Sequence, residues 1–300
     1  EEAAPRGGRA CWVRSLGILT GTLTLDGLEQ ASVAAGGFHT CALQNDGQLV
    51  CFGHAAALPQ DRGLVRSVSA GLYHTCVVRA EDEHLACFGL KCSVPQDLGP
   101  VLAISAGDYH TCAVRTDGRL VCFGRNAAGQ CDVPESLGPV LAVSAGGEHT
   151  CAVRMDGNLF CFGDNSNGQC NVPAHLGPVI AVSAGTSHTC AKRTDGLLVC
   201  FGRNLRGQCD VPPDLGPVLA VSAGGDHTCA VRADNAQLVC FGDNCRGHCD
   251  VPVDLGPILA VSAGDYHTCA VQTDGQLVCF GYNNNGQCNP PTGLAMTPSM

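Results

Sequence analysis

The sequence predicts an all-β protein, a seven-bladed β-propeller, from three observations. A tripeptide recurs seven times, each repeat contains a hairpin turn, and the strands around that turn are apolar on both faces. The tripeptide His-Thr-Cys begins at His39, His74, His110, His149, His188, His227 and His267. A period of roughly 35–40 residues is typical of repeat proteins in which each unit buries its faces against its neighbours.

The fourth unit shows the elements of one repeat. Residues 140–145, Val-Leu-Ala-Val-Ser-Ala, form a nearly continuous apolar run of strand length. Residues 149–153 and 159–163 flank the dipeptide Asp156-Gly157, which is a strong hairpin signal. Each unit is therefore an antiparallel meander, and we expect blades of three or four strands. Radial stacking covers both faces of such strands, whereas the alternative, a linear β-solenoid, is built from shorter coils without hairpins.

The repeats also suggest domain boundaries. We expect an N-terminal extension at residues 1–16, a propeller at 17–291 and a C-terminal tail at 292–300. The segments 18–20 or 22–25 could supply an edge strand that joins the first blade to the last. Residues 1–6, which start neither with Met nor with the apolar stretch of a signal peptide, suggest a processed or trimmed chain.

Composition and charge exclude several classes of partner. The chain has 39 Gly and 16 Pro among 300 residues, which suits short strands joined by tight turns. Its net charge of −10 leaves no basic surface for nucleic acid or anionic lipid. No apolar run approaches the ~20 residues of a membrane-spanning helix. We therefore expect neither a nucleic-acid partner nor direct insertion into a membrane.

The 22 cysteines follow the repeat, and their register can be counted from the hairpin turn. A three-residue turn in the fourth unit places Cys151 opposite Cys161, and two units with an eleven-residue separation have longer turns that absorb the difference. The candidate disulfides are Cys41–Cys51, Cys76–Cys87, Cys112–Cys122, Cys151–Cys161, Cys190–Cys200, Cys229–Cys240 and Cys269–Cys279. Buried thiols in a reducing compartment are the alternative, and a zinc site is disfavoured because the chain has no Cys-x-x-Cys knuckle.

The repeated motifs resemble those of a known family. The pattern Ala-Gly-x-x-His-Thr-x-Ala-Val, Asp-Gly-x-Leu, Phe-Gly-x-Asn-x-x-Gly-Gln is similar to the regulator of chromosome condensation (RCC) repeat, and it covers about residues 28–291. The short unit resembles compact bacterial members, including secreted β-lactamase-inhibitor propellers, more than the eukaryotic nucleotide-exchange factor. Departures are Phe where the family usually has Trp, Cys at three repeat positions, and a degenerate first unit after Phe52.

A third set of cysteines lies where the family usually has Leu, so we expect packed thiols there. This set comprises Cys92, Cys131, Cys170, Cys209, Cys249 and Cys288. Cys11 and Cys245 fall outside the repeat. The repeat histidine is expected to hydrogen-bond backbone in its own tight turn or to reach the next blade.

Binding residues are expected on one face of the ring. The loop before each His and the loop after each Phe-Gly emerge on the same face, and chemically distinctive residues vary there from unit to unit. The candidate partner-binding residues are Phe38, Tyr73, Asp108, Tyr109, Arg125, Glu148, Asp164, Arg203, Arg206, Asp226, Asp243, Arg246, Asp265, Tyr266 and Tyr282. Tyr and Arg dominate binding hot spots, although ordinary solvated loops would also carry these residue types.

The chain lacks the common catalytic motifs, and residues present seven times seldom form one active site. We therefore expect a non-enzymatic protein-binding or scaffold propeller without cofactor or bound metal, as a monomeric ring or a subunit of a larger assembly. The RCC resemblance implies two alternatives: nucleotide exchange on a small GTPase, or a substrate-binding module of a HERC-type ubiquitin ligase. The cysteine content slightly favours an oxidising compartment, secreted or lumenal, over the cytosol.

Overall fold

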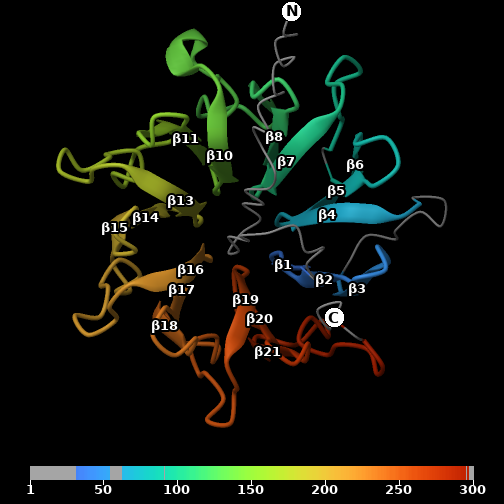
Figure 1. The fold of residues 1–300 in the computed structure, drawn as a ribbon, viewed down its shortest axis with the longest axis vertical. Helices are drawn as coiled ribbons and strands as arrows, with labels where there is room; N and C mark the ends of the chain where they lie inside the picture. Colours follow the sequence, from blue (N-terminus) through green and yellow to red (C-terminus); the bar gives the residue numbers. More distant parts are fainter. Residues whose placement is uncertain (1–31, 55–62, 91, 295, 297–300) are drawn as a thin grey trace, which may run out of the picture.

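The seven repeats form seven separate antiparallel sheets of three strands each, placed around a common axis (Figure 1). The computed structural model describes residues 32–54, 63–90, 92–294 and 296. Within a sheet the strand order follows the sequence, so each sheet is a simple meander. We number these sheets as blades 1 to 7 in chain order. The seven-bladed all-β propeller predicted from the repeats is confirmed.

The strands take the same place in every blade. The first strands lie nearest the axis: β1 (Ser32–Ala35), β4 (Val65–Ala70), β7 (Val101–Ala106), β10 (Val140–Ala145), β13 (Val179–Ala184), β16 (Val218–Ala223) and β19 (Ile258–Ala263). The middle strands are β2 (His39–Leu43), β5 (His74–Arg79), β8 (His110–Arg115), β11 (His149–Arg154), β14 (His188–Arg193), β17 (His227–Arg232) and β20 (His267–Gln272). The outer strands are β3 (Leu49–Gly53), β6 (Leu85–Gly89), β9 (Leu120–Gly124), β12 (Leu159–Gly163), β15 (Leu198–Gly202), β18 (Leu238–Gly242) and β21 (Leu277–Gly281). A 3-10 turn, η1 (Glu135–Leu137), precedes β10.

The hairpin register agrees with the one counted from the sequence. Cys151 lies opposite Cys161 and Val153 opposite Leu159. The turn between them contains Gly157 at φ 80°, a left-handed conformation that glycine adopts without strain. All seven predicted cysteine pairs are disulfides, each between directly opposed residues of the middle and outer strands, with Cα atoms 4.1 Å apart.

Two blades keep this pairing although their turns are longer. In blade 2 the Arg79 N–H donates to the His84 carbonyl, and in blade 6 the Arg232 N–H donates to the Gln237 carbonyl. Each of these turns has a non-glycine residue with positive φ, 60° at Glu83 and 56° at Ala236. The extra residue is absorbed in the turn, so Cys76–Cys87 and Cys229–Cys240 remain opposed as predicted.

The core lies between the blades because the middle strands are covered on both faces. Cys151, Ala152 and Val153 of β11 are fully buried. One apolar cluster joins Cys151 and Val153 of blade 4 to Val179 and Val182 of blade 5. Another joins blade 7 to blade 1, so the first and last blades pack like the others. The radial stacking inferred from doubly apolar strands is thereby confirmed.

Polar hydrogen bonds join neighbouring blades inside this apolar core. The ring nitrogen Nε2 of His149 lies 2.9 Å from Oγ1 of Thr189 in the next blade. The same contact runs around all seven blades and ends with His267 and Thr40 at 2.7 Å. Of the two partners left open for the repeat histidine, the structure has the next blade.

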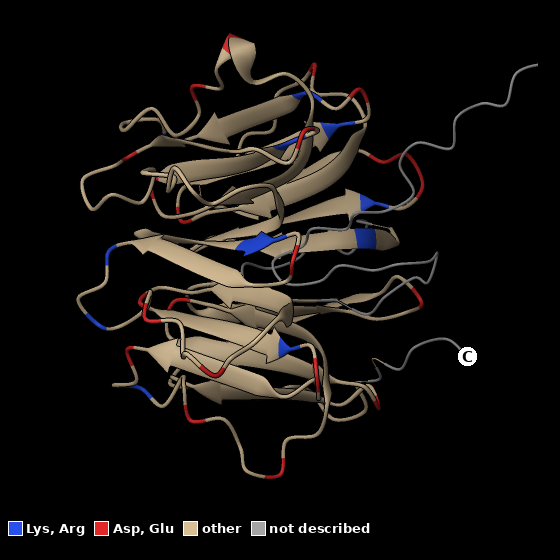
Figure 2. Cartoon of the chain, turned by 60° about the vertical axis from the view of Figure 1, so that its left-hand side comes forward, with Lys and Arg blue, Asp and Glu red and all other residues tan. Residues whose placement is uncertain are grey.

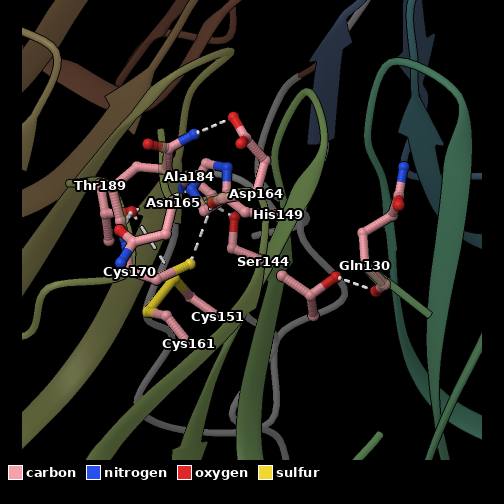
Figure 3. The surroundings of a disulfide bond; sticks show 12 residues. Gln130, Ser144, His149, Cys151, Cys161, Asp164, Asn165, Cys170, Ala184 and Thr189 are labelled. Atoms are coloured by element: carbon pink, nitrogen blue, oxygen red, sulfur yellow. Dashed lines mark hydrogen bonds between the residues drawn. A yellow bond between two sulfur atoms is a disulfide. The ribbon is translucent and has the colours of Figure 1, made fainter. Parts of the chain in front are cut away.

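A second set of bonds runs closer to the axis. The Ser144 hydroxyl accepts a hydrogen bond from the Ala184 N–H at 2.9 Å (Figure 3). Six blades have this serine, whereas blade 1 has Ala34 at that position. Every joint therefore has the His–Thr bond, and six joints have a Ser–Ala bond as well.

Some expectations lie outside the described residues. These are the N-terminal extension at 1–16, the candidate edge strand within 18–25, and most of the degenerate loop of the first unit at 55–62. Within the described ranges every blade has three strands, the lower of the two numbers expected, because the segment after each Phe-Gly forms a compact loop.

Candidate functional site

The loops before each histidine and after each outer strand lie side by side on one face, which we call the loop face. The Arg125 N–H donates to the Tyr109 carbonyl at 2.9 Å, and the Tyr282 N–H donates to the Tyr266 carbonyl at 2.9 Å. Asp164 and Glu148 are joined in the same way at 2.8 Å. Charged residues concentrate in the loops and at strand ends, leaving the middle of the sheets nearly free of charge (Figure 2).

The loop that follows each outer strand is held in shape by residues of the repeat itself. The Asn165 side-chain oxygen accepts the Cys170 N–H at 2.9 Å, and the Gln169 side-chain oxygen accepts the Asn167 N–H at 2.9 Å. The Cys170 thiol donates to the Asp164 carbonyl at 3.3 Å (Figure 3). The third set of cysteines was expected to be packed thiols, but these residues are only partly buried and act as weak hydrogen-bond donors within their own loops.

A ring of seven glycines surrounds the axis just below the loop face. A Cβ atom at Gly146 would lie 2.4 Å from the Gly185 carbonyl oxygen, and the other six glycines are equally close to the next blade. The mouth of a central channel is lined by Gly37, Leu72, Asp108, Thr186 and Asp265. Gly147 and Gly225 occupy the equivalent sequence position in blades 4 and 6. Leu72 and Thr186 were not among the predicted site residues, although they belong to the variable positions before the histidine.

Five aromatic side chains form a continuous arc beside this mouth. Phe38 stacks on Tyr73 with ring centroids 5.8 Å apart and contacts Tyr266 at 6.0 Å. Tyr109 extends the arc from Tyr73 at 6.5 Å, and Tyr282 extends it from Tyr266 at 6.2 Å. Tyr73 and Tyr266, which both contact Phe38, are 41% and 43% exposed, so the arc is accessible from solvent. We call these five residues the aromatic arc, and it spans blades 7, 1, 2 and 3.

An arginine packs against each end of the arc. The guanidinium of Arg125 lies 5.3 Å from the centre of the Tyr109 ring, and that of Arg246 lies 5.4 Å from the centre of the Tyr282 ring. Such cation–π contacts contribute about 0.5–1 kcal/mol at exposed sites and orient both side chains. The arc is thus a pre-ordered surface of aromatic and arginine side chains.

The other half of the loop face is ionic. Ion pairs join Arg125 to Glu148 at 2.9 Å, Arg203 to Asp226 at 3.6 Å and Arg206 to Asp243 at 3.8 Å. Asp164 accepts hydrogen bonds from its own loop, from Ser166 and Gln169. The predicted partner-binding residues are therefore on one face. Five of them form the aromatic arc, and most of the charged ones are ion-paired or hydrogen-bonded, with Asp108 and Asp265 as exceptions.

The carboxyl groups of Asp108 and Asp265 differ from the other acidic side chains of the loop face, Glu148, Asp164, Asp226 and Asp243, because within the described ranges they have no hydrogen-bond or ion-pair partner. Burial raises the pKa of Asp265 to about 8, helped by the charges of Asp108 and Asp226. Burial together with Glu148 raises the pKa of Asp108 to about 6. Burial, and then the Asp108 carboxylate, raises the pKa of Tyr109.

The repeat histidines are structural groups. Thr189 Oγ1 donates its hydrogen to the Gln169 carbonyl at 2.8 Å, so it must accept a hydrogen from Nε2 of His149. The imidazole is consequently the neutral Nε2–H tautomer, and Nδ1 has no hydrogen-bond partner. Burial lowers the pKa of His149 to about 3. A buried neutral ring engaged with the next blade is unavailable to substrate or metal.

No group of three His, Cys, Asp or Glu residues in the described part of the chain could hold a metal ion. In the same residues no helix is long and apolar enough to cross a membrane. In blade 6, His248 occupies the position that Gln has in blades 3, 4, 5 and 7, and it packs on His227 with ring centroids 4.5 Å apart.

Comparison with models of protein families shows to which family this chain belongs. The model described as the regulator of chromosome condensation (RCC1) repeat matches residues 31–55, 101–130, 140–169, 179–208, 218–247 and 258–287. The chain belongs to the RCC1 repeat family. The predicted resemblance is confirmed, and the second repeat lies outside the matched segments. No curated protein sequence matches this RCC1-repeat chain significantly.

Solved structures with the RCC1-type propeller are similar to this chain. The CRINKLY WD40 ectodomain of the receptor kinase ACR4 from Arabidopsis thaliana is 26% identical, with a TM-score of 0.69, over 84% of this chain and 97% of that one. The entire ectodomain of the receptor kinase CR4 from Physcomitrella patens is 25% identical, with a TM-score of 0.71, over 89% and 77%. Prp20p from Saccharomyces cerevisiae is 18% identical, with a TM-score of 0.54, over 89% and 76%, and shows the fold alone.

Proposed function

We propose that this RCC1-repeat chain is a non-enzymatic protein-binding propeller whose partner docks on the aromatic arc. The observation that supports this proposal is the arc itself, in which five partly exposed aromatic rings each contact the next and an arginine packs at either end. Aromatic residues and Arg are enriched at protein interfaces, and hot spots concentrate in such clusters. A rigid platform also loses little side-chain entropy on binding.

The compartment proposed for this binding is extracellular or otherwise oxidising. Seven disulfides lie in the described residues, and such bonds persist outside reducing compartments. Two structural neighbours are ectodomains of receptor kinases. A partner that is itself secreted or displayed on a cell surface fits both facts.

The experiment compares two double variants of the disulfide-bonded chain. Tyr109→Ala with Tyr266→Ala removes part of the arc, whereas Met155→Ala with Leu197→Ala removes two side chains that are 53% and 43% exposed in the turns of the opposite face. Capture of proteins from an extracellular fraction should fall at least tenfold for the arc variant and stay unchanged for the control. Equal capture by both variants, with unchanged circular dichroism and Tm, would overturn the proposal.

Nucleotide exchange on a small GTPase is the second candidate. Its support is limited to the fold, which Prp20p shares at 18% identity; that protein's structure was described with its binding properties to Gsp1p and histones. Release of a fluorescent guanine nucleotide from a small GTPase, measured by stopped flow, tests it. A rate unchanged by a large excess of the propeller would remove this candidate.

A further inference from the structure

Two carboxyl groups at the mouth of the central channel have no partner within the described residues. Asp108 of blade 3 and Asp265 of blade 7 both line this channel. Asp265 adjoins Tyr266, and Asp108 adjoins Tyr109, so each belongs to the same loop as a tyrosine of the arc. A half-buried carboxylate without a hydrogen bond or counter-ion is costly, and such groups are often retained for binding.

Neighbouring glycines leave room around both groups. Oδ2 of Asp265 lies 3.2 Å from the place that a Cβ at Gly37 would take, and Oδ2 of Asp108 lies 3.1 Å from that at Gly147. The channel itself has a volume of about 50 Å³. Since one water needs about 10–15 Å³ of cavity, this space suits a small polar group rather than a ring.

The positive groups nearby are already engaged. Glu148 pairs with Arg125, and Asp226 pairs with Arg203, so neither guanidinium is available to the channel mouth. Burial, with the charge of Glu148, raises the pKa of Asp108 to about 6, and burial, with the charges of Asp108 and Asp226, raises the pKa of Asp265 to about 8, as expected for acids without a cation beside them. The mouth therefore contains two carboxyl groups without a counter-ion, at the edge of the aromatic arc.

We propose that the channel mouth binds one primary ammonium group, the lysine side chain of a protein docked on the aromatic arc, between Asp108 and Asp265. This inference rests on the proposed function and names the chemistry of the partner. An ammonium is a compact charge with three donors, which matches two carboxylates in a narrow space. Tyr109 and Tyr266 add cation–π attraction at the rim.

A divalent metal and a guanidinium fit the same place less well. Calcium takes six to eight oxygen ligands, and two carboxylates supply too few. A guanidinium is a wide planar fork, better suited to one carboxylate that it can bind with two parallel hydrogen bonds than to a channel of this volume.

The test uses n-butylammonium as a lysine side-chain analogue, titrated into the disulfide-bonded chain and followed by NMR of the tyrosine and aspartate side chains. We expect saturable shifts at Asp108, Asp265, Tyr109 and Tyr266, and at least tenfold weaker binding for the double variant Asp108→Asn with Asp265→Asn. Because both carboxylates must lose their protons to bind a cation, affinity should rise between pH 6 and pH 9.

The controls separate this site from general acidity. Asp156→Asn, in an exposed turn of the opposite face, should leave butylammonium binding unchanged. Butanol should produce no shift, and calcium chloride or methylguanidinium at equal concentration should compete at least tenfold less well. Absence of saturation, equal binding by the double Asn variant, or stronger binding of calcium or methylguanidinium would each overturn the inference.

Partner capture then distinguishes the inference from the function on which it rests. If the Tyr109/Tyr266 variant loses the partner and the Asp108/Asp265 variant keeps it, the arc binds a protein but the mouth does not bind its lysine. If both variants lose the partner and acetylation of the partner's lysines has the same effect, the inference holds. Capture unaffected by the tyrosine substitutions refutes the proposed function, whatever butylammonium does.

Discussion

Acid should unfold this propeller through its histidine ring, because the seven buried imidazoles must stay neutral in the folded state. Burial lowers the pKa of six of them to about 3 or about 4, and that of His227 well below the ordinary value of 6.5. Their folded pKa values are depressed, so their contribution to stability is fully present above pH 6.5. It is lost as the pH falls from 6.5 toward 4.

The magnitude follows from proton linkage. Each imidazole that protonates only on unfolding costs about 1.4 kcal/mol per pH unit below 6.5, or about 2 kcal/mol at pH 5. Asp108 and Asp265 act in the opposite direction, because their folded pKa values are raised and they hold protons in the folded state. Two carboxyl groups oppose seven histidines, so stability should still fall steeply with acid.

The assay is unfolding by guanidinium chloride, with disulfides intact, at several values between pH 7.5 and pH 4.5. In the variant His188→Gln, an amide replaces the imidazole that contacts Thr228, and no proton is taken up there on unfolding. The slope of unfolding free energy against pH should fall by about 1.4 kcal/mol per unit. The control His175→Gln changes an exposed histidine and should keep the wild-type slope. Equal slopes for the two variants would refute the reasoning.

Four further predictions concern covalent and packing features. Of the 22 cysteines, 14 form disulfides and eight remain: the seven free cysteines of the described residues and Cys11. Thiol labelling without reductant should therefore detect seven or eight thiols per chain. Labelling of about 22 thiols would exclude the disulfides. Replacing Cys151 and Cys161 together by Ala should lower the unfolding free energy by about 3 kcal/mol in chemical denaturation, with little change for Cys170→Ala. Ala34→Ser should add the missing Ser–Ala bond to Ala70 and raise that free energy by about 1 kcal/mol; a lower Tm would contradict this. Gly146→Ala should cost about 1–3 kcal/mol by the same measurement, because its Cβ would meet the Gly185 carbonyl.

The blades can be predicted from the sequence because the pairing of their strands is decided by residues that are close together in the chain. The register of Cys151 and Cys161 depends only on the length of one turn, and a longer turn in blade 2 compensates visibly for its extra residue. The sequence predicts three or four strands in each blade, because the segment after Phe-Gly has no β pattern that would decide its pairing. The loops that adjoin on one face also follow from antiparallel strand order.

Contacts between blades could not be derived from the sequence. Phe38 meets Tyr266 only because blade 7 closes on blade 1, and the spacing and tilt of the blades decide which rings touch. The partner of the repeat histidine stayed open for the same reason, since Thr189 is 40 residues from His149. Likewise, Asp108 and Asp265 were grouped with loop residues that turn out to be ion-paired, because an unpaired carboxylate has no sequence signature.

The positions of the disulfides have a mechanical consequence. In the described residues all seven lie inside single blades, whereas neighbouring blades are held together by side-chain and main-chain hydrogen bonds and by apolar contacts. In this part of the chain each blade is therefore stiffened internally by its disulfide, and no disulfide crosses from one blade to another. A small change in ring diameter therefore breaks no disulfide. If one joint between blades weakens, the other six still close the ring. Both joints of a blade must open before that blade can separate from its neighbours.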